Sequence, residues 1–520
     1  MVQQEKKQEC LEEGGCHLTG KLFIKAEFKL KSPLIIGSGE SEQTDIDVIR
    51  DDPYTGPRAA LLPASSVIGV FRHLFDPLIK EENADFVKAY YEFFGCTEDE
   101  NNKLLKELRK EHQPNKKWDV NQSALVMSDM VLKGLNISRR DGVRIDPRTG
   151  TAVDRAKFDY EIVEPDKEKR FFMNFEINLR SPSKKYKDYF KAFIGTFLKE
   201  IDDGHIGFGA KTNKGFGVFT LVENGIKIAD LDFENTETNK TAIRHWLKND
   251  LHEQYKSISI SELCEKKLPE IPKRLFTIQA EFRIKNSLLI RSYSTNPQDP
   301  DVSSMQRGED YILPGPSLMG AIRHRAWKII NTMIPTNKET LFYDLFGFVA
   351  IDSYPEVPEN LKEKFEQKAA KGRLQVNESV IERYGSSILD QVQTRIKIDR
   401  FTGGTMTGAL LQEKVLWQAD KETTLKLEMR LLDYQDWEAG LLLFILKDLV
   451  TGDLAIGGEK AIGRGVLTGH SATITWSERQ YPVQLKFDEG FINDDSQLEP
   501  LLKFEEAWRK ELNHQSEKKT

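Results

Sequence analysis

The first clear pattern in the chain is a strict alternation of apolar and polar positions. From Leu22 to Leu30 every second residue is apolar, and most of the residues between them are charged. A period of two residues predicts a β-strand with one buried face. Farther along, Pro63-Ala64-Ser65 precedes apolar residues at helical spacing, which predicts a helix with the serine as its N-cap.

The same patterns return later in the chain. Five blocks recur in the same order, with offsets between 248 and 254 residues. The pairs are 22–36 with 275–290, 62–75 with 313–326, 93–95 with 345–347, 144–146 with 397–399, and 209–219 with 457–467. Chance can supply one such match but not five in order, so the sequence predicts a tandem duplication.

The chain therefore divides into two repeats with flanking segments. The predicted ranges are a polar N-terminal tail at 1–19, repeat 1 at 20–225, a charged connector with a helix at 226–272, repeat 2 at 273–475, and a C-terminal helix with a polar tail at 476–520.

Each repeat has the element order of a known α+β topology. An acidic loop and a helix follow the first strand, and an exposed hairpin is predicted in mid-repeat, at 139–158 and 395–414. A strand, a second helix (187–200 and 435–449), a glycine-rich loop and a last strand complete the repeat. The order strand–helix–strand–strand–helix–strand is ferredoxin-like and is shared with the RNA-recognition motif. We therefore expect two tandem ferredoxin-like domains, each with an inserted hairpin.

Composition and charge narrow the class of protein. The 520 residues are 39% hydrophobic and 30% charged with a net charge of −7, which is typical of a globular chain and argues against a surface coated with basic charge. The longest apolar run, Leu441 to Leu446, is too short for a membrane helix, and the polar start predicts no secretory signal. We expect a cytoplasmic protein. Cys10, Cys16 and His17 are the closest cysteine–histidine group and do not complete a four-ligand zinc site.

Glycine-rich loops and basic hairpins recur in both repeats. Each loop follows a helix and precedes a strand, the reverse of a dinucleotide-binding fingerprint. Glycine has no Cβ, so these loops can bring backbone amides close to RNA; an ordinary turn is the alternative. The hairpins carry net charges of +3 over 139–158 and +2 over 395–400, which favours phosphate contacts, although a solvated hairpin explains the charge too. The candidate RNA-binding residues here are Arg139, Arg140, Arg144, Arg148, Lys211, Lys214, Gly215, Gly217, Arg395, Lys397, Arg400, Gly463, Arg464 and Gly465.

A pair of basic residues occupies matching helix positions. These are Arg72 with His73 and Arg323 with His324. We interpret the arginines as contacts to the RNA backbone and count the histidines with them. A histidine on an amphipathic helix is more often a packing residue than a general base.

The acidic loops are the sharpest signal. Asp45-Ile46-Asp47-Val48 begins nine residues after Ile36, and Asp299-Pro300-Asp301-Val302 begins nine residues after Ile290. A loop carboxylate beside an RNA groove can hold a hydrated Mg²⁺ or accept the proton of a ribose 2′-OH. The alternative is a solvated turn or an Asx cap.

Together these blocks resemble the RAMP superfamily, and specifically the backbone subunits of type III CRISPR effector complexes. The similarity rests on the opening strand into Ile36-Gly37-Ser38-Gly39, the stretch VIRDDPYTG from Val48, the helix start LPASSVIG, the LFG segment and the glycine-rich loop. It covers both repeats and is similar to a tandem fusion of two such subunits, as in type III-D systems.

The resemblance implies a division of labour within each repeat. A ferredoxin-like palm would bind the crRNA guide, and a thumb hairpin would displace a nucleotide of the guide–target duplex. An aspartate of the first loop would promote cleavage of the target RNA with Mg²⁺ or another divalent cation. The implied partners are the crRNA, the target RNA, a large subunit and further backbone subunits, with no membrane.

The resemblance also points to individual aspartates. The family's catalytic aspartate lies three residues before the valine of a Val-Ile-Arg/Lys-Asp stretch, which is Asp45 here. In repeat 2 that stretch has become Val302-Ser303-Ser304-Met305, and Asp299 takes the equivalent place by spacing. Asp47 and Asp301 are the reserve candidates, and the metal ligands beyond Asp45 and Asp299 are not predicted.

We therefore expect an RNA-guided endoribonuclease subunit with two cleavage sites. A non-catalytic crRNA scaffold, whose aspartates are structural, is the first alternative. The second is a metal-independent ribonuclease that processes guide RNA with His73 or His324.

Overall fold

The computed structural model describes residues 17–39, 44–52, 57–79, 84–96, 122–146, 151–181, 183–271, 273–293, 298–334, 338–349, 369–382, 388–420, 422, 424–488, 491–492 and 497–517. The predictions for Cys10, Cys16 and Arg148 lie outside these residues. Packing divides the chain into unit 1 (Met1–Arg140, Tyr160–Ala210, Gly217–Pro272) and unit 2 (Asp141–Asp159, Lys211–Phe216, Lys273–Thr520). Two short segments of the first repeat, 141–159 and 211–216, thus belong to unit 2.

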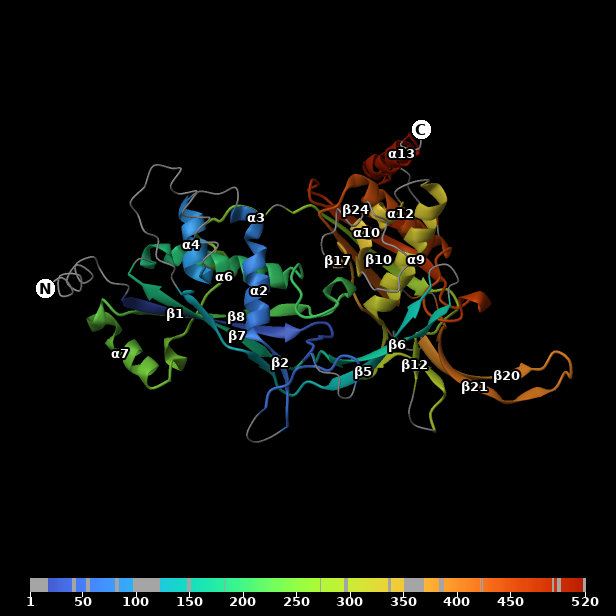
Figure 1. The fold of residues 1–520 in the computed structure, drawn as a ribbon, viewed down its shortest axis with the longest axis horizontal. Helices are drawn as coiled ribbons and strands as arrows, with labels where there is room; N and C mark the ends of the chain where they lie inside the picture. Colours follow the sequence, from blue (N-terminus) through green and yellow to red (C-terminus); the bar gives the residue numbers. More distant parts are fainter. Residues whose placement is uncertain are drawn as a thin grey trace. The chain divides into compact units, whose positions relative to one another are not determined.

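A five-stranded antiparallel sheet forms the centre of unit 1, in the order β3-β7-β1-β8-β9 (Figure 1). Its strands are β1 Leu18–Leu30, β3 Leu125–Met127, β7 Phe171–Arg180, β8 Phe219–Asp232 and β9 Lys256–Ser257. The first four places in this order are those of a ferredoxin-like sheet, in which the first strand lies between the third and the fourth. The predicted alternation is confirmed, because Leu22, Ile24 and Phe28 are at most 1% exposed.

Aromatic side chains join the helices of unit 1 to this sheet. Helices α2 (Ala64–Leu74), α4 (Ala84–Phe94) and α6 (Lys187–Asp202) contribute most of them. Phe71 stacks on Phe197 with ring centroids 4.1 Å apart, and both rings meet Phe175 of β7 edge-on. Offset and edge-on pairs of this kind stabilise a core beyond the area that they bury. The other elements of unit 1 are β2 Ala60–Leu62, β4 Met130–Leu132, α3 Asp76–Ile79, α7 Thr236–Leu247, α8 Ile260–Leu263 and the 3₁₀ turns η1 Lys184–Tyr186 and η3 His252–Gln254.

The start of α2 differs from the prediction. Pro63 is the N-cap, and no side chain of that residue caps the helix, so the predicted serine cap is wrong. The carboxylate of Asp129 accepts the Ala64 backbone N–H at 2.7 Å. It therefore satisfies one of the backbone donors at the start of the helix, as a capping side chain would. In unit 2, helix α9 (Gly315–Met333) likewise follows an N-cap proline, Pro314.

Unit 2 repeats the same core in a larger sheet. Its order is β14-β15-β19-β22-β10-β23-β24-β25, with β18 also paired with β22. The strands are β10 Leu275–Ile284, β14 Gln306–Arg307, β15 Asp310–Leu313, β18 Leu374–Val376, β19 Ser379–Ile381, β22 Leu425–Leu432, β23 Leu467–Trp476, β24 Val483–Asp488 and β25 Phe491–Ile492. The run β18-β22-β10-β23 matches the four-strand order of unit 1. Both units are therefore ferredoxin-like, and the α+β class is confirmed.

Helices and short strands complete unit 2. The helices are α9, α10 Lys338–Phe346, α12 Asp436–Thr451 and α13 Leu502–Glu517, with the 3₁₀ turns η2 Thr212–Lys214, η4 Lys460–Ile462 and η6 Glu499–Leu501. The short strands are β11 Ser287–Leu288, β12 Arg291–Tyr293, β13 Val302–Ser304, β16 Gly347–Val349 and β17 Ala369–Lys371. Trp508 of α13 is 1% exposed and packs beside Trp437 of α12, so the predicted C-terminal helix is part of the core.

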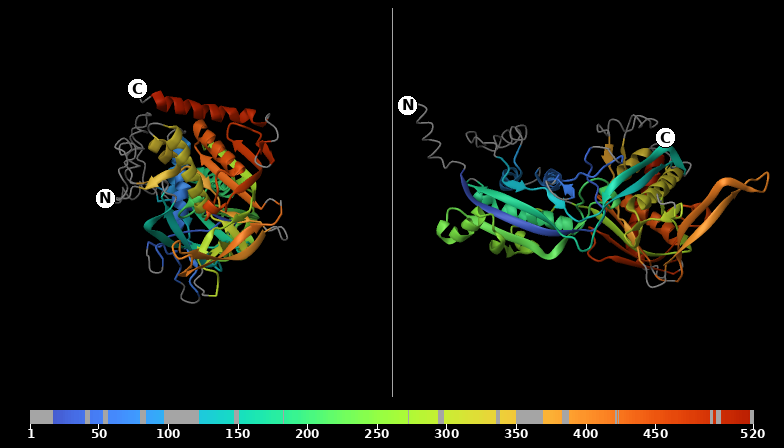
Figure 2. Two further views of the ribbon diagram at one scale, coloured as in Figure 1. Left: turned by 90° about the vertical axis from the view of Figure 1, so that its right-hand side faces the viewer. Right: turned by 90° about the horizontal axis from the view of Figure 1, so that it is seen from below.

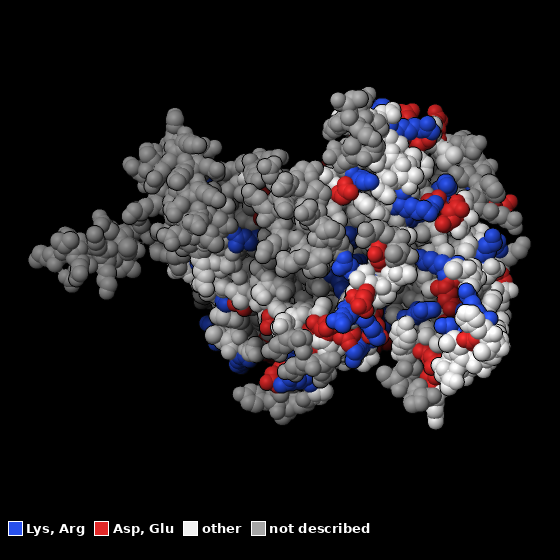
Figure 3. All heavy atoms as spheres, turned by 45° about the vertical axis from the view of Figure 1, so that its right-hand side comes forward, with Lys and Arg blue, Asp and Glu red and all other residues white. Residues whose placement is uncertain are grey.

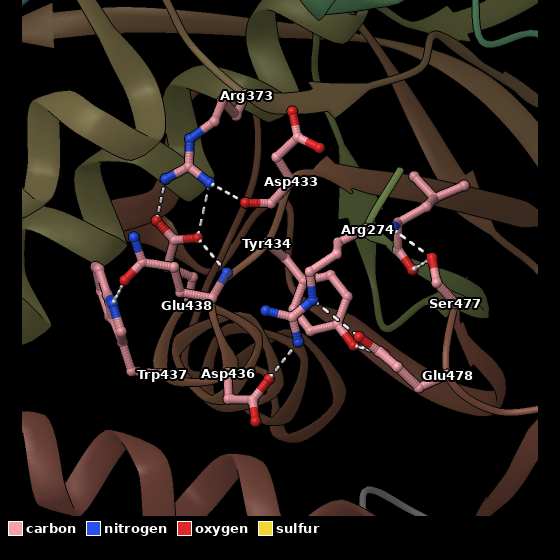
Figure 4. Close-up of polar contacts among 11 residues, drawn as sticks. Arg274, Arg373, Asp433, Tyr434, Asp436, Trp437, Glu438, Ser477 and Glu478 are labelled. Carbon is pink, nitrogen blue, oxygen red and sulfur yellow. Dashed lines mark hydrogen bonds and ion pairs between the residues drawn. The ribbon is translucent and has the colours of Figure 1, made fainter. Parts of the chain in front are cut away.

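A polar network fixes the start of α12 to the surrounding strands (Figure 4). Glu438 accepts the Gln435 backbone N–H at 2.8 Å and forms an ion pair with Arg373. Burial raises the pKa of Glu438 above its usual range, and Arg373 opposes that shift. Arg274, at the start of β10, binds Asp436 at 3.0 Å and lies over the ring of Tyr434. The network therefore holds the first strand and the second helix of the palm together.

Each repeat carries the predicted hairpin. The first is formed by β5 (Ile137–Ile145) and β6 (Ala152–Val163), and the second by β20 (Ile388–Ile398) and β21 (Thr405–Gln418). The β20–β21 hairpin projects away from the rest of unit 2 (Figure 2). Among the described residues, no helix is both long enough and apolar enough to span a membrane.

Candidate nucleic-acid interface

The acidic loop of unit 1 holds its two aspartates in different environments. Asp45 is exposed, whereas Asp47 is 7% exposed. Asp47 Oδ1 accepts hydrogen bonds from the Thr44 backbone N–H at 2.9 Å and from the Thr44 hydroxyl at 2.8 Å. Asp47 is thus held within the loop by Thr44, whereas Asp45 lies at the protein surface.

A buried glutamate anchors the residues that follow these aspartates. Glu161, on the second hairpin strand, accepts the Val48 backbone N–H at 2.9 Å and pairs with Arg50 at 2.8 Å. The hydrogen bond that Arg50 donates to Glu161 raises the pKa of Arg50 above its usual value. The loop is thereby tied to the base of the hairpin.

The acidic loop of unit 2 lies beside β12 and β13, which pair antiparallel. Asp299 and Asp301 are both exposed. Asp301 Oδ2 accepts the backbone N–H of Gln412 in β21 at 2.8 Å. This loop too is attached to the second strand of its hairpin.

The paired helix residues have partners within the protein. In unit 1, Arg72 Nε donates to the Tyr90 hydroxyl at 3.3 Å, and that hydroxyl donates to Asp76 at 3.2 Å. His73 lies 2.6 Å from the same carboxylate and is largely exposed. In unit 2, Arg323 is exposed and lies 5.2 Å from the ring centre of Phe342. His324 is half-buried on the same helix.

The glycine-rich loops have the same backbone conformation in both repeats. Positive φ occurs at four matching positions, which are Gly209, Lys211, Gly215 and Gly217 in the first loop and Gly457, Glu459, Gly463 and Gly465 in the second. A Cβ on Gly217 would lie 1.9 Å from the Phe208 carbonyl oxygen, and one on Gly465 would lie 1.7 Å from the Ile456 carbonyl oxygen. These two glycines are required to close the turn itself, so contact with RNA stays a prediction. Burial, and then the charge of Arg323, lower the pKa of Lys214 within unit 2.

Several predicted RNA-binding arginines are instead held by carboxylates of the protein, and two of them, Arg140 and Arg464, are buried. Arg395 pairs with both carboxylate oxygens of Glu459, at 2.6 and 2.8 Å, and Arg464 binds Glu459 at 2.6 Å. Glu413, which is fully buried, lies 3.4 Å from Arg395. In unit 1, Arg140 is 5% exposed. Their charge is compensated locally, which sequence alone could not reveal.

Other basic residues of the hairpins are accessible. Arg139, Lys397 and Arg400 are exposed, and Arg144 is half-buried. Figure 3 shows one face on which Lys and Arg side chains of the described residues lie among Asp and Glu side chains. On this face the described basic residues form local groups rather than a uniformly basic surface.

Sequence reasoning missed an apolar stripe on the β20–β21 hairpin. Val392, Ile396 and Leu410 are each more than half exposed, and Ile396 is paired with Leu410 across the hairpin. Phe401 at the tip is 99% exposed. The signal was present as alternate apolar residues in a segment predicted to project into solvent.

The donor sets available to a metal ion are small. Within the described ranges, no three or more His, Cys, Asp or Glu side chains form a group that could hold a metal ion. A divalent cation at either acidic loop would need ligands from bound RNA and water as well.

Two ferredoxin-like units, each with an acidic loop attached to the second strand of a hairpin, define a tandem α+β protein. The family model of the RAMP superfamily matches residues 27–220 and 281–468, and the chain belongs to that superfamily. It is accordingly a CRISPR-associated RNA-binding subunit. A comparison with curated proteins finds no match.

Proposed function

We propose that this chain is a backbone subunit of a type III, III-D-like, CRISPR effector complex that binds crRNA and cleaves complementary target RNA at two sites. Asp45 carries the first site, and the acidic loop with Asp299 and Asp301 carries the second. The supporting observation is the same in both units: exposed aspartates lie on a loop attached to the base of a hairpin. The proposed partners are the large subunit and further backbone subunits, in the cytoplasm.

In this proposal base pairing reads the sequence, while the protein grips the RNA backbone and its shape. Cleavage forms a bond between a ribose 2′-oxygen and the adjacent phosphorus and breaks the bond to the 5′-oxygen. The 2′-OH proton passes to a base, and the 5′-oxygen takes a proton from solvent. The carboxylate of Asp45 is the acceptor that we assign to the first site.

Strain in the RNA would complete the site. An intact stack keeps the 2′-OH out of line with the 5′-oxygen, and unstacking one base costs a few kcal/mol. A hairpin inserted into the duplex can meet that cost and supply the alignment, which is worth about 7–11 kcal/mol in the best-oriented reactions. The exposed Phe401 and the apolar stripe suit such an insertion in unit 2.

A divalent cation fits the loops only as an ion shared with RNA. Mg²⁺ keeps several waters and binds through one or two carboxylates together with phosphate oxygens, and an exposed Asp45 can provide one of these. When bound, the ion would stabilise the charge that develops on the phosphate. EDTA is therefore expected to stop cleavage while guide RNA remains bound.

The test uses the assembled complex with a labelled complementary RNA. Asp45→Asn is expected to remove one of two cleavage products and to leave the other product and guide binding unchanged. An unchanged product pattern would favour the scaffold alternative, which the small donor sets of the described residues also allow. Cleavage that survives EDTA but is lost in His73→Ala would favour the guide-processing alternative.

A further inference from the structure

Strand pairing aligns the two acidic loops independently of their spacing in sequence. In unit 1, Gly37 forms a β-bridge with Val48, and the Ile49 N–H donates to the Ile36 carbonyl at 2.8 Å. These contacts fix which residues after the acidic loop lie beside Ile36 and Gly37.

Unit 2 contains the same contacts with different spacing. Arg291 pairs with Ser304, and the Met305 N–H donates to the Ile290 carbonyl at 2.8 Å. Ile290 is the repeat counterpart of Ile36. Ser304 therefore corresponds to Val48 of unit 1 in the backbone.

A second set of pairs gives the same alignment from the other side. Arg50 forms a bridge with Ala60, the residue two before Leu62. Gln306 pairs with Tyr311, which lies two before Leu313, the repeat counterpart of that leucine. Arg50 lies two residues after Val48, and Gln306 lies two residues after Ser304. The match of Val48 with Ser304 is therefore supported by the contacts that precede it and by those that follow it.

The residue after each aspartate meets the hairpin in a corresponding way. In unit 1, the Ile46 carbonyl accepts the N–H of Glu161 in β6 at 3.0 Å. In unit 2, Val302 pairs in parallel with Glu413 of β21. The register thus places Val302, and not Pro300, at the position that Ile46 has in unit 1.

We infer that Asp301, and not Asp299, is the unit 2 counterpart of Asp45 and the catalytic aspartate of the second site. The loop of unit 2 is two residues longer, so equal spacing from the strand selects the wrong residue. Asp301 lies three residues before Ser304, as Asp45 lies three before Val48. The inference rests on the proposed function and goes beyond it by assigning one residue to the second site.

The surroundings of the aspartates agree with this assignment. Asp45, Asp299 and Asp301 are all exposed, so the assignment depends on the strand register and not on exposure. Ser303 of β13 occupies the position that Asp47 has in unit 1, and it pairs with Ser292 of β12. The hydrogen bond from the Gln412 N–H to Asp301 orients its carboxylate at the base of the hairpin, where a displaced nucleotide would lie in the proposed function.

The experiment compares Asp301→Asn and Asp299→Asn in the assembled complex, with Asp45→Asn as the internal reference. Asparagine retains an oxygen for the Gln412 N–H, so the loop of the Asp301 variant should keep its conformation. Asp301→Asn is expected to slow formation of the second product at least 100-fold, and Asp299→Asn to change it less than twofold. Glu309→Gln, in the exposed turn after β14, is the matched carboxylate control, and bound guide RNA per complex reports correct assembly.

Three outcomes would overturn the inference. Loss of the second product in Asp299→Asn with Asp301→Asn active would do so, as would a second product that neither variant affects. A wild-type complex with a single product, lost in Asp45→Asn, would show that unit 2 has no site. In all three cases the reference variant still supports the first site. A product pattern unchanged in Asp45→Asn as well would instead contradict the proposed function.

Discussion

At the scale of single residues, the acidic loop of unit 1 separates stability from chemistry. Asp47 accepts two hydrogen bonds from Thr44 in a buried position, while Asp45 is exposed. Asp47→Ala is expected to lower the free energy of unfolding by about 1–3 kcal/mol, because it leaves a buried donor without its acceptor. Asp45→Ala is expected to stay within about 0.5 kcal/mol of wild type. Denaturant unfolding measures both, and equal losses would contradict the assignment of roles.

A titratable carboxylate, that of Asp399, holds the tip of the β20–β21 hairpin by hydrogen bonds. Asp399 accepts the Thr402 N–H at 2.8 Å and the Phe401 N–H at 2.9 Å, and these bonds lower the pKa of Asp399. A carboxyl pKa lowered by folding gives stability that is present above the unfolded value of about 3.9 and is lost as pH falls through the folded value. Hydrogen-exchange protection of the two amides should therefore hold at neutral pH and decline below about pH 4.

Two variants test that prediction. Asp399→Ala should remove the protection at every pH. Asp399→Asn keeps an acceptor oxygen without titrating, so its protection should not change with pH. The same decline in the asparagine variant would assign it to another group.

Some residue roles could be predicted from sequence and others could not. Asp45 is exposed, as both a catalytic loop aspartate and a solvated turn require, so its role stays a prediction. Arg395 and Arg464 both pair with Glu459, which is 64 residues from Arg395 in sequence. The order of charged residues along the chain does not show which acidic side chains lie beside an arginine in the folded protein.

At the scale of elements, Glu161 connects the acidic loop of unit 1 to its hairpin. Glu161→Gln keeps one acceptor oxygen but removes the charge opposite Arg50, so the loop after Asp45 should loosen. Cleavage at the first site is expected to fall about tenfold with guide binding unchanged, since a misplaced catalytic group is enough to slow a reaction. Amide exchange at Val48 should rise in parallel, which a change in chemistry alone would not produce.

A surface ion pair nearby gives the matched control. Arg58 and Asp52 lie 3.1 Å apart with side chains 65% and 82% exposed. Such pairs contribute between 0 and about 1 kcal/mol. Asp52→Asn should therefore leave both cleavage and amide exchange unchanged. Equal effects of Asp52→Asn and Glu161→Gln would contradict the anchoring role of Glu161.

The elements and the order of the central strands were largely predictable, and the strand register beside the acidic loops was not. The helix predicted at 187–200 is α6, Lys187–Asp202, and the one predicted at 435–449 is α12, Asp436–Thr451, because apolar periodicity marks a buried face. The predicted hairpin 395–414 extends to β20–β21, Ile388 to Gln418. Its projecting part buries little, so no burial pattern marks where it ends. Loop length hides the strand register, and so spacing favoured Asp299 over Asp301.

At the scale of the whole molecule, the duplication could be recognised from sequence because it repeats local patterns. Packing then divides the chain differently, since 141–159 and 211–216 belong to the first repeat and to unit 2. The repeats are defined by matching sequence, whereas the units are defined by which residues pack together. The ordered blocks predicted the family but did not show that these two segments of the first repeat belong to unit 2.

The net charge of −7 makes RNA binding a local property of this chain. Charges beyond about 8 Å are largely screened at physiological ionic strength, so the acidic remainder does little to a phosphate held at a basic hairpin. Lys397 and Arg400 are exposed, and neither forms an ion pair with another residue in the part of the chain that the structure describes. They are the cations of the unit 2 hairpin that remain available to a phosphate.

Their joint removal should therefore change the salt dependence of binding. Each neutralised phosphate of a single strand contributes a slope of about −0.7 to the logarithmic plot of affinity against salt. Lys397→Ala with Arg400→Ala should make the slope shallower by up to about 1.4, measured with the full chain and single-stranded RNA of guide length. Arg509→Ala, which removes an exposed arginine paired with Glu505 on α13, should leave the slope unchanged. A bound phosphate responds only to charges within its own screening distance, so equal slopes for the two variants would contradict phosphate contacts at Lys397 and Arg400.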